Sequence, residues 1–294
     1  MATLGDMILS IRDQIPDPVT DPSLDGTAFS FASLLRWIND AQRIICAGAP
    51  VIQDWHGLPS ITGMSIYELP QYITSVEQAW YNLLPLTRAP EGGTIYTTKV
   101  TSRSWWFGPH SIHATPRLHV WPAPDRTAST STLTAPLSQT GTTVTVASST
   151  AFNVFGYAQI EQELILFQNK TATAFNNVLR GQSGTLAISH NNGVPITDCN
   201  IFFKCYRLPR TLITAADPIE LPQTLWPLVE LYVQAKVKSA EQDIQESLAI
   251  MREFLRLVDR LAEKGPQIKG LRQGMQVKIL DPTVELFRGR TIIP

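Results

Sequence analysis

The feature that most constrains the fold of this chain is a long amphipathic stretch at residues 224–264. Apolar residues recur in its second half at steps of three and four, which places them on one face of an α-helix. These residues are Ile244, Leu248, Met251, Leu255, Val258 and Leu261. Gly265 and Pro266 end the helix, because glycine adopts the left-handed cap and proline cannot continue the helix.

The first half of the same stretch predicts a separate helix that begins near Pro227. Its apolar stripe consists of Leu228, Leu231, Tyr232 and Ala235. Amphipathic helices mostly bury such stripes within their own domain, so we expect both helices to pack in a helical core.

Two more helices are predicted near the N-terminus. The first covers residues 3–14, with Thr3 as its cap, and the second begins near Ser30 and ends at Gly48. We expect residues 51–55 to add one more helical turn.

The composition then changes to that of β-strands. Residues 73–86 are rich in valine, tryptophan, tyrosine and leucine, and residues 117–121 and 200–207 alternate as strands do. We expect the last two strands to be neighbours in one sheet. The long sequence between them therefore indicates an inserted domain.

The predicted insert covers residues 126–198 and opens with a Ser/Thr-rich linker at 126–134. Four short β-prone runs follow at a spacing of roughly 8–12 residues, which is typical of a small β-sandwich or barrel. They cover residues 142–146, 156–160, 164–168 and 175–179.

The chain closes with residues 266–294, which combine glycine and proline with apolar patches. We expect an extended arm that folds against another chain. The predicted fold class is therefore α+β. A helical bundle with a small sheet (1–125 plus 199–265) carries the all-β insert and the C-terminal arm.

Composition narrows the function. The formal net charge is -1 and no basic run is present, which argues against broad nucleic-acid affinity. Only 17% of the residues are charged, against about 25% in typical domains, and this favours an assembling protein.

No apolar stretch approaches the roughly 20 residues of a membrane helix, and no signal peptide is evident. We expect a protein made in the cytoplasm, with Cys46, Cys199 and Cys205 as buried reduced thiols.

No pattern of catalytic residues emerges. The phosphate-loop, dinucleotide, nucleophile-elbow and HExxH motifs are all missing. His110 and His113 lie in a loop without a neighbouring ligand residue. Glu161 and Glu163 are two apart on a predicted strand, where a calcium site is conceivable but a solvated face is favoured. We expect no enzyme, no cofactor and no metal.

Two aromatic segments leave alternatives open. The triplet Trp105-Trp106-Phe107 is either a binding platform or, as we favour, a loop that plugs a core or an interface. Asp54 and His56 flank Trp55 and suggest an acid–base pair, but side chains so close in sequence rarely point together.

Several segments resemble the head-to-tail adaptor (connector) proteins of tailed bacteriophages. They are residues 4–13, 25–26, 34–42, 117–124, 206–209 and 221–222. The insert resembles a small β-module of phage tail and baseplate proteins. This second likeness rests on residues 144–147, 158–161, 164–167, 179–185 and 187–193, and it implies a structural role for His190.

The resemblance implies a virion protein at the head–tail interface. Adaptors form a ring, commonly of twelve copies, that binds the portal protein and the tail or nozzle proteins, and DNA passes through the lumen without specific binding. The arm would grip the portal, with Phe287, Arg288 and Arg290 as candidate contacts. One alternative is a tail-associated protein whose β-module recognises a host surface glycan, with Trp105 and Trp106 as a stacking platform. Another is a wall-degrading hydrolase that uses Glu161 or Glu163.

Overall fold

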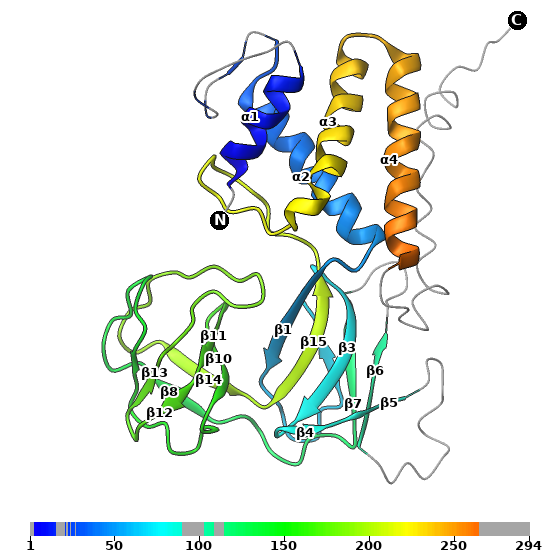
Figure 1. The fold of residues 1–294 in the computed structure, drawn as a ribbon. Coiled ribbons are helices and arrows are strands. Elements are labelled where there is room, and N and C mark those ends of the chain that lie inside the picture. The colour runs from blue at the N-terminus through cyan, green and yellow to red at the C-terminus, as the bar shows by residue number, and fades with distance from the viewer. Residues whose placement is uncertain are drawn as a thin grey trace, which may run out of the picture.

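The fold is α+β, as the sequence predicts, and is seen in a computed structural model (Figure 1). The expected arm at 266–294, with Phe287, Arg288 and Arg290, lies outside the described residues. Those are residues 3–15, 21, 23, 25–26, 28–89, 103–108 and 115–264.

The helical region contains the four predicted helices, and their observed bounds agree with the prediction. They are α1 Leu4–Gln14, α2 Phe31–Gly48, α3 Trp226–Ala240 and α4 Ile244–Lys264. Thr3 caps α1 in a capping box, in which Thr3 and Asp6 satisfy each other's backbone N–H groups. Ser30 caps α2 by accepting a hydrogen bond from the Ser33 N–H. The short 3-10 helix η1, Gln223–Leu225, leads into α3.

The buried faces of α3 and α4 match the predicted stripes only in part, with Tyr232, Ala235 and Val258 buried as expected. In α3, Val229 and Val233 are fully buried, whereas Leu228 and Leu231 are only partly buried. In α4 the buried apolar positions are Phe254 and Val258, and Ser247 is buried beside them. The helical period is right, but the α3–α4 packing is centred to one side of the predicted stripe, because the partner helix decides which part of a wide apolar face is covered.

Residues 51–55 form no helical turn, so this prediction is wrong. They belong to strand β1, Ile52–Leu58, which pairs antiparallel with β15, Ile201–Arg207, along its whole length. The backbone hydrogen bonds of a central neighbouring strand outweigh the weak local preference of so short a segment.

Two four-stranded sheets pack below the helices (Figure 1). The first has the order β1-β15-β3-β4, with β3 Ile73–Tyr81 and β4 Leu84–Pro85. The order in the second is β2-β7-β6-β5, with β2 Ile66–Glu68, β5 Thr87–Arg88, β6 Ser104–Gly108 and β7 Arg117–Trp121.

The expectation that the strands now labelled β7 and β15 are neighbours in one sheet is wrong. They lie in different sheets and share a core, in which Leu118 and Val120 of β7 pack with Phe203 and Cys205 of β15. Alternating apolar residues are expected of any strand with one buried face. The pattern is therefore the same whether two strands pair in one sheet or lie in two sheets that share a core.

The insert (residues 126–198) has a hydrophobic core of its own, which includes Ile160, Phe167, Phe175 and Ile196. One sheet has the order β11-β10-β14-β8 and the other β12-β13-β9, and neither closes into a barrel. Their strands are β8 Thr130–Thr132, β9 Val144–Thr145, β10 Gly156–Ile160, β11 Glu163–Phe167, β12 Asn169–Lys170, β13 Ala174–Asn176 and β14 Pro195–Cys199.

The segment 126–134 is not merely a linker, because it contains β8. This strand pairs with β14, with Thr130 opposite Thr197 and Thr132 opposite Pro195. Its polar side chains are tolerated because β8 is an edge strand that needs little burial. The chain therefore enters and leaves the insert on two adjacent strands.

A close approach joins the insert to β1. A Cβ atom at Gly57 would lie 2.8 Å from the Cβ of Tyr157 and 2.9 Å from the Cβ of Cys199. Real Cβ atoms do not come so near one another, so only glycine allows β1 to pack this tightly against β10 and β14.

We therefore expect Gly57→Ala to lower the free energy of unfolding by about 1–3 kcal/mol through overpacking. Gly108→Ala is the matched control, since a Cβ there meets nothing closer than 3.5 Å, at the His119 ring. Urea unfolding followed by tryptophan fluorescence measures both. Equal midpoints for the two variants would show that the contact at Gly57 is not tight in solution.

Candidate functional site

Arg207, at the end of β15, connects the sheet to the helical region. Its side chain is buried, and its Nε donates to Asp54 Oδ2 of β1 at 2.9 Å. Nη1 and Nη2 donate to the two carboxylate oxygens of Glu220, each at 2.9 Å. Nη1 also donates to the Leu208 carbonyl at 3.2 Å. The fork geometry of arginine suits such a bidentate pair.

The charges of this cluster reinforce one another. Burial raises the pKa of Glu220, but hydrogen bonds from Arg207 and from the Arg210 backbone outweigh it, and the pKa lies below its usual value. Burial likewise lowers the pKa of Arg207, but the two carboxylates raise it above its usual value. Arg207 and Glu220 therefore stabilise each other's charged forms.

A loop of the insert reaches the same place. The His56 Nδ1 lies 2.7 Å from Ser183 Oγ, and burial lowers the His56 pKa to about 4. Arg210 Nη1 donates to the Thr185 carbonyl at 3.5 Å. Gly184, with φ +79°, lies so near Arg207 that a Cβ would be 3.3 Å from its Nη1. Asp54 and His56 thus have separate partners, and no acid–base pair forms between them.

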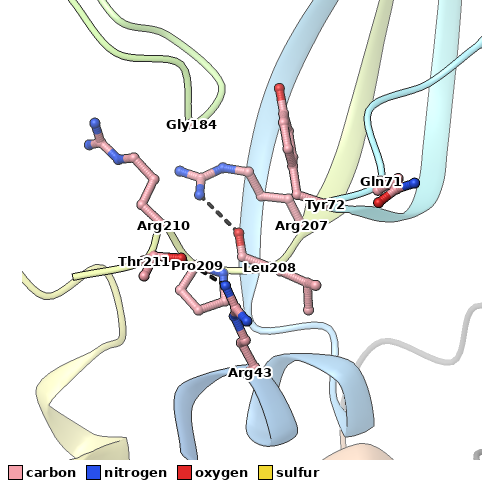
Figure 2. Close-up of a pocket in the computed structure, with 9 residues that line it drawn as sticks. All are labelled: Arg43, Gln71, Tyr72, Gly184, Arg207, Leu208, Pro209, Arg210 and Thr211. Carbon is pink, nitrogen blue, oxygen red and sulfur yellow. Dashed lines mark hydrogen bonds between the residues drawn. The ribbon is translucent and has the colours of Figure 1, made fainter. Parts of the chain in front are cut away.

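A cavity of about 490 Å³ opens beside Arg207 (Figure 2). Arg43 comes from α2, beneath the 208–211 segment, and donates Nη2 to Thr211 Oγ1 at 2.7 Å. The nine lining residues are Arg43, Gln71, Tyr72, Gly184, Arg207, Leu208, Pro209, Arg210 and Thr211. Three of the nine lining residues are thus arginines, set among apolar groups such as Leu208 and Pro209.

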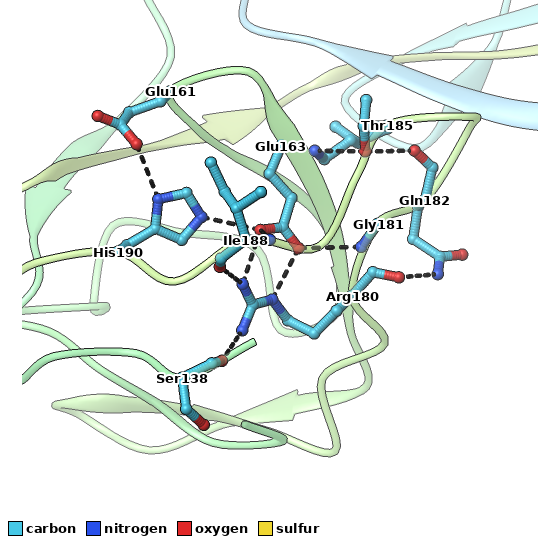
Figure 3. Close-up of polar contacts among 10 residues, drawn as sticks. Ser138, Glu161, Glu163, Arg180, Gly181, Gln182, Thr185, Ile188 and His190 are labelled. Carbon is cyan, nitrogen blue, oxygen red and sulfur yellow. Dashed lines mark hydrogen bonds and ion pairs between the residues drawn. The ribbon is translucent and has the colours of Figure 1, made fainter. Parts of the chain in front are cut away.

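A second polar cluster lies inside the insert and centres on Glu163 (Figure 3). Its carboxylate accepts hydrogen bonds from Arg180 Nε at 2.7 Å and Nη2 at 2.6 Å, and from the Gly181 N–H at 2.9 Å. The Ile188 N–H donates at 3.3 Å, and His190 Nε2 lies 2.8 Å away. The prediction of a solvated face is wrong for Glu163, which is fully buried.

His190 connects the two glutamates that the sequence analysis singled out. Its Nδ1 lies 2.8 Å from Glu161 Oε2 and its Nε2 2.8 Å from Glu163 Oε2. The two ring nitrogens thus face one carboxylate each, Glu161 on one side and Glu163 on the other. The histidine therefore acts as a structural cross-link, and no group of three or more potential metal ligands is found among the described residues.

The aromatic triplet forms strand β6 rather than a loop. Trp105 and Phe107 are buried in the core between the sheets, as expected of a core plug, while Trp106 stacks on His119 with ring centroids 4.0 Å apart. Trp105 is 1% exposed and so cannot belong to a glycan platform.

Cys46, Cys199 and Cys205 are buried and free, as predicted. Their thiols gain no reactivity, because burial raises the pKa of each.

The Arg207 cluster was not found from the sequence. Its partners Asp54 and Glu220 come from β1 and from the segment before α3, and only the fold brings them together. The one available signal is a charged residue at the end of a strand that is apolar apart from Lys204. His110 and His113, like the candidate portal contacts Phe287, Arg288 and Arg290, lie outside the described residues.

The helical region on small sheets is held to them by a buried ion-pair cluster, and comparison with known families gives the class of the protein as a bacteriophage adaptor. The family model of the SU10 adaptor protein matches residues 2–177 of the 294, from α1 into the insert. The chain therefore belongs to the SU10 adaptor protein family, whose members are structural components of phage particles. A comparison with curated proteins found no match. Among the described helices, none is long and apolar enough to cross a membrane.

Proposed function

We propose that this adaptor forms a ring that joins the capsid portal to the tail and lengthens the DNA channel. Twelve copies would pack side by side through a heterologous contact, in which one face of each subunit meets a different face of the next. The ring would hold no cofactor and catalyse no reaction. Its net charge of -1 suits a lumen through which DNA slides without binding.

The observation that carries this proposal is the incompletely covered apolar face of α4. Ile244 is 65% exposed, and Leu248, Met251 and Leu255 are only partly buried. A long amphipathic helix rarely leaves so many apolar positions open to solvent in its final assembly. A neighbouring subunit in a ring would cover them.

We assign the other parts of the chain by the same proposal. Residues 1–125 and 199–265 form the ring body, and residues 126–198 are a separate domain that projects towards the tail. Residues 266–294 reach the portal, where Phe287, Arg288 and Arg290 make contacts. The core of the insert is distinct from the cores of the helical region and of the paired sheets, which supports this division.

An Ile244→Glu variant tests the ring contact. Because Ile244 is exposed, the folded subunit should tolerate the change, whereas a buried unpaired carboxylate at each subunit contact should weaken assembly at least about tenfold, the equivalent of roughly 1.4 kcal/mol. Ile213→Glu is the matched control, since Ile213 is 69% exposed but lies outside α4.

Native mass spectrometry of each chain, alone and mixed with the portal ring of its phage, gives the copy number. We expect wild type and Ile213→Glu to saturate the portal at one fixed number, and Ile244→Glu to saturate it incompletely. If the wild-type chain binds no portal, the proposal fails. If Ile244→Glu assembles as well as the control, α4 is not the ring contact.

A further inference from the structure

The cavity beside Arg207 has an unbalanced charge. Arg43, Arg207 and Arg210 all line it, and none of its nine described lining residues is acidic. The two carboxylates that pair with these arginines, Asp54 and Glu220, lie behind Arg207 and outside the wall. The lining itself therefore carries three guanidinium groups and no carboxylate among its described residues.

The three arginines are not equally engaged. Arg207 uses Nε, Nη1 and Nη2 within the cluster and is held rigidly. Arg43 is exposed and donates Nη2 to Thr211, which occupies one of the five N–H groups of its guanidinium. Arg210 has a 40% exposed side chain, with Nε on Glu220. Arg43 and Arg210 therefore retain donor capacity for a ligand.

From these features we propose that the cavity binds an acidic segment of a partner protein through aspartate or glutamate carboxylates. Guanidinium groups recognise planar carboxylates by paired, charge-assisted hydrogen bonds. Gln71 and Tyr72 add polar groups on the opposite side (Figure 2). A cavity of about 490 Å³ has room for a few side chains.

A protein partner is favoured over DNA by the shape and isolation of the site. DNA presents a charge every 1.7 Å or so along a duplex and is bound by extended basic stripes. Here the three arginines line one recess and form no such stripe. The proposal goes beyond the ring, since it concerns a single subunit and holds whatever the assembly state.

Isothermal titration of the full chain with a tri-glutamate peptide tests the proposal, with inorganic phosphate and a short DNA duplex as alternative probes. We expect the peptide to bind saturably at one per chain. Arg43→Gln should weaken this binding about tenfold, as expected for losing one charge-assisted hydrogen bond. Arg256→Gln is the control, since Arg256 lies on α4 and pairs with Glu253 away from the cavity.

Arg43 is exposed, so its loss should leave the fold intact, and circular dichroism verifies this. Peptide binding that is absent, or equal in Arg43→Gln and Arg256→Gln, would overturn the proposal. So would one-to-one binding of phosphate or duplex in place of the peptide. None of these measurements needs the portal or the ring, so a negative result here is distinct from failure of the proposed function.

Discussion

Replacing Glu163 by glutamine is expected to lower the free energy of unfolding of the insert by about 3–5 kcal/mol, the usual effect of breaking a buried ion pair. The fully buried Glu163 carboxylate pairs with Arg180 and His190 and accepts two backbone N–H groups. Glutamine keeps the shape but turns one acceptor oxygen into an NH2 group. That group would face donors, and Arg180 would be left buried without a counter-charge.

The insert contains no tryptophan, so its unfolding should be followed by hydrogen exchange of the β10–β11 peptides rather than by fluorescence. Glu161→Gln is the matched control, because the side chain of Glu161 is 52% exposed and contacts only one side of His190. We expect a loss below about 1 kcal/mol for this control. Comparable hydrogen exchange of the β10–β11 peptides in the two variants would show that the buried ion pair of Glu163 does not stabilise the insert.

Comparing wild type with Glu163→Gln at different pH values gives a second test of the Glu163 cluster. Burial raises the pKa of Glu163, but hydrogen bonds from Arg180, His190 and Gly181 outweigh it, and the pKa lies below its ordinary value of 4.5. The stability that Glu163 contributes is therefore fully present above pH 4.5 and is lost as the pH falls through its folded pKa. The stability difference between wild type and Glu163→Gln should shrink on acidification and stay constant above pH 6 or so.

Replacing Arg207 by leucine should be comparably severe, with a loss of about 3–5 kcal/mol. The variant removes the cation that Glu220 and Asp54 share, and the largely buried Glu220 then keeps only the partly exposed Arg210 as its counter-charge. Urea unfolding monitored by tryptophan fluorescence reports this loss, since tryptophans lie in the helical region and in both sheets beneath it.

Arg210→Leu is the control for this second test. Arg210 shares Glu220 with Arg207 but is 40% exposed, so water screens its charge and we expect a loss of about 1 kcal/mol or less. The triple replacement Arg207→Leu, Glu220→Leu and Asp54→Leu should recover part of the lost stability, because it removes the unpaired charges. If Arg207→Leu is as stable as Arg210→Leu, the cluster does not hold the two regions together.

The helices were predictable because their signals are local. Thr3 and Ser30 are N-caps by residue type, and the apolar spacing of α4 is visible in the sequence. What sequence could not decide was which part of each helix face is covered. Whether Ile244 or Phe254 is buried depends on where α3 packs against α4, which is a property of the tertiary structure.

The errors among the strands have the same origin. The predicted helical turn at residues 51–55 is part of β1, whose pairing partner β15 is distant in sequence. The predicted pairing of β7 with β15 fails because alternation identifies a strand but not its neighbour. The buried polar groups were harder still. The spacing of Glu161 and Glu163 marks them as a pair, yet the basic partners Arg180 and His190 become evident only when the loop after β13 folds back on β11.

The joint between β14 and β15 has a mechanical consequence. One residue, Asn200, separates a strand of the insert from the central strand of the β1-β15-β3 sheet. Tension applied to the insert therefore passes along covalent backbone into a strand hydrogen-bonded on both sides, which resists shear far better than an edge strand does. Because the chain before β8 leads back to β7, a strand of the other sheet, a pull on the insert would be divided between the two sheets.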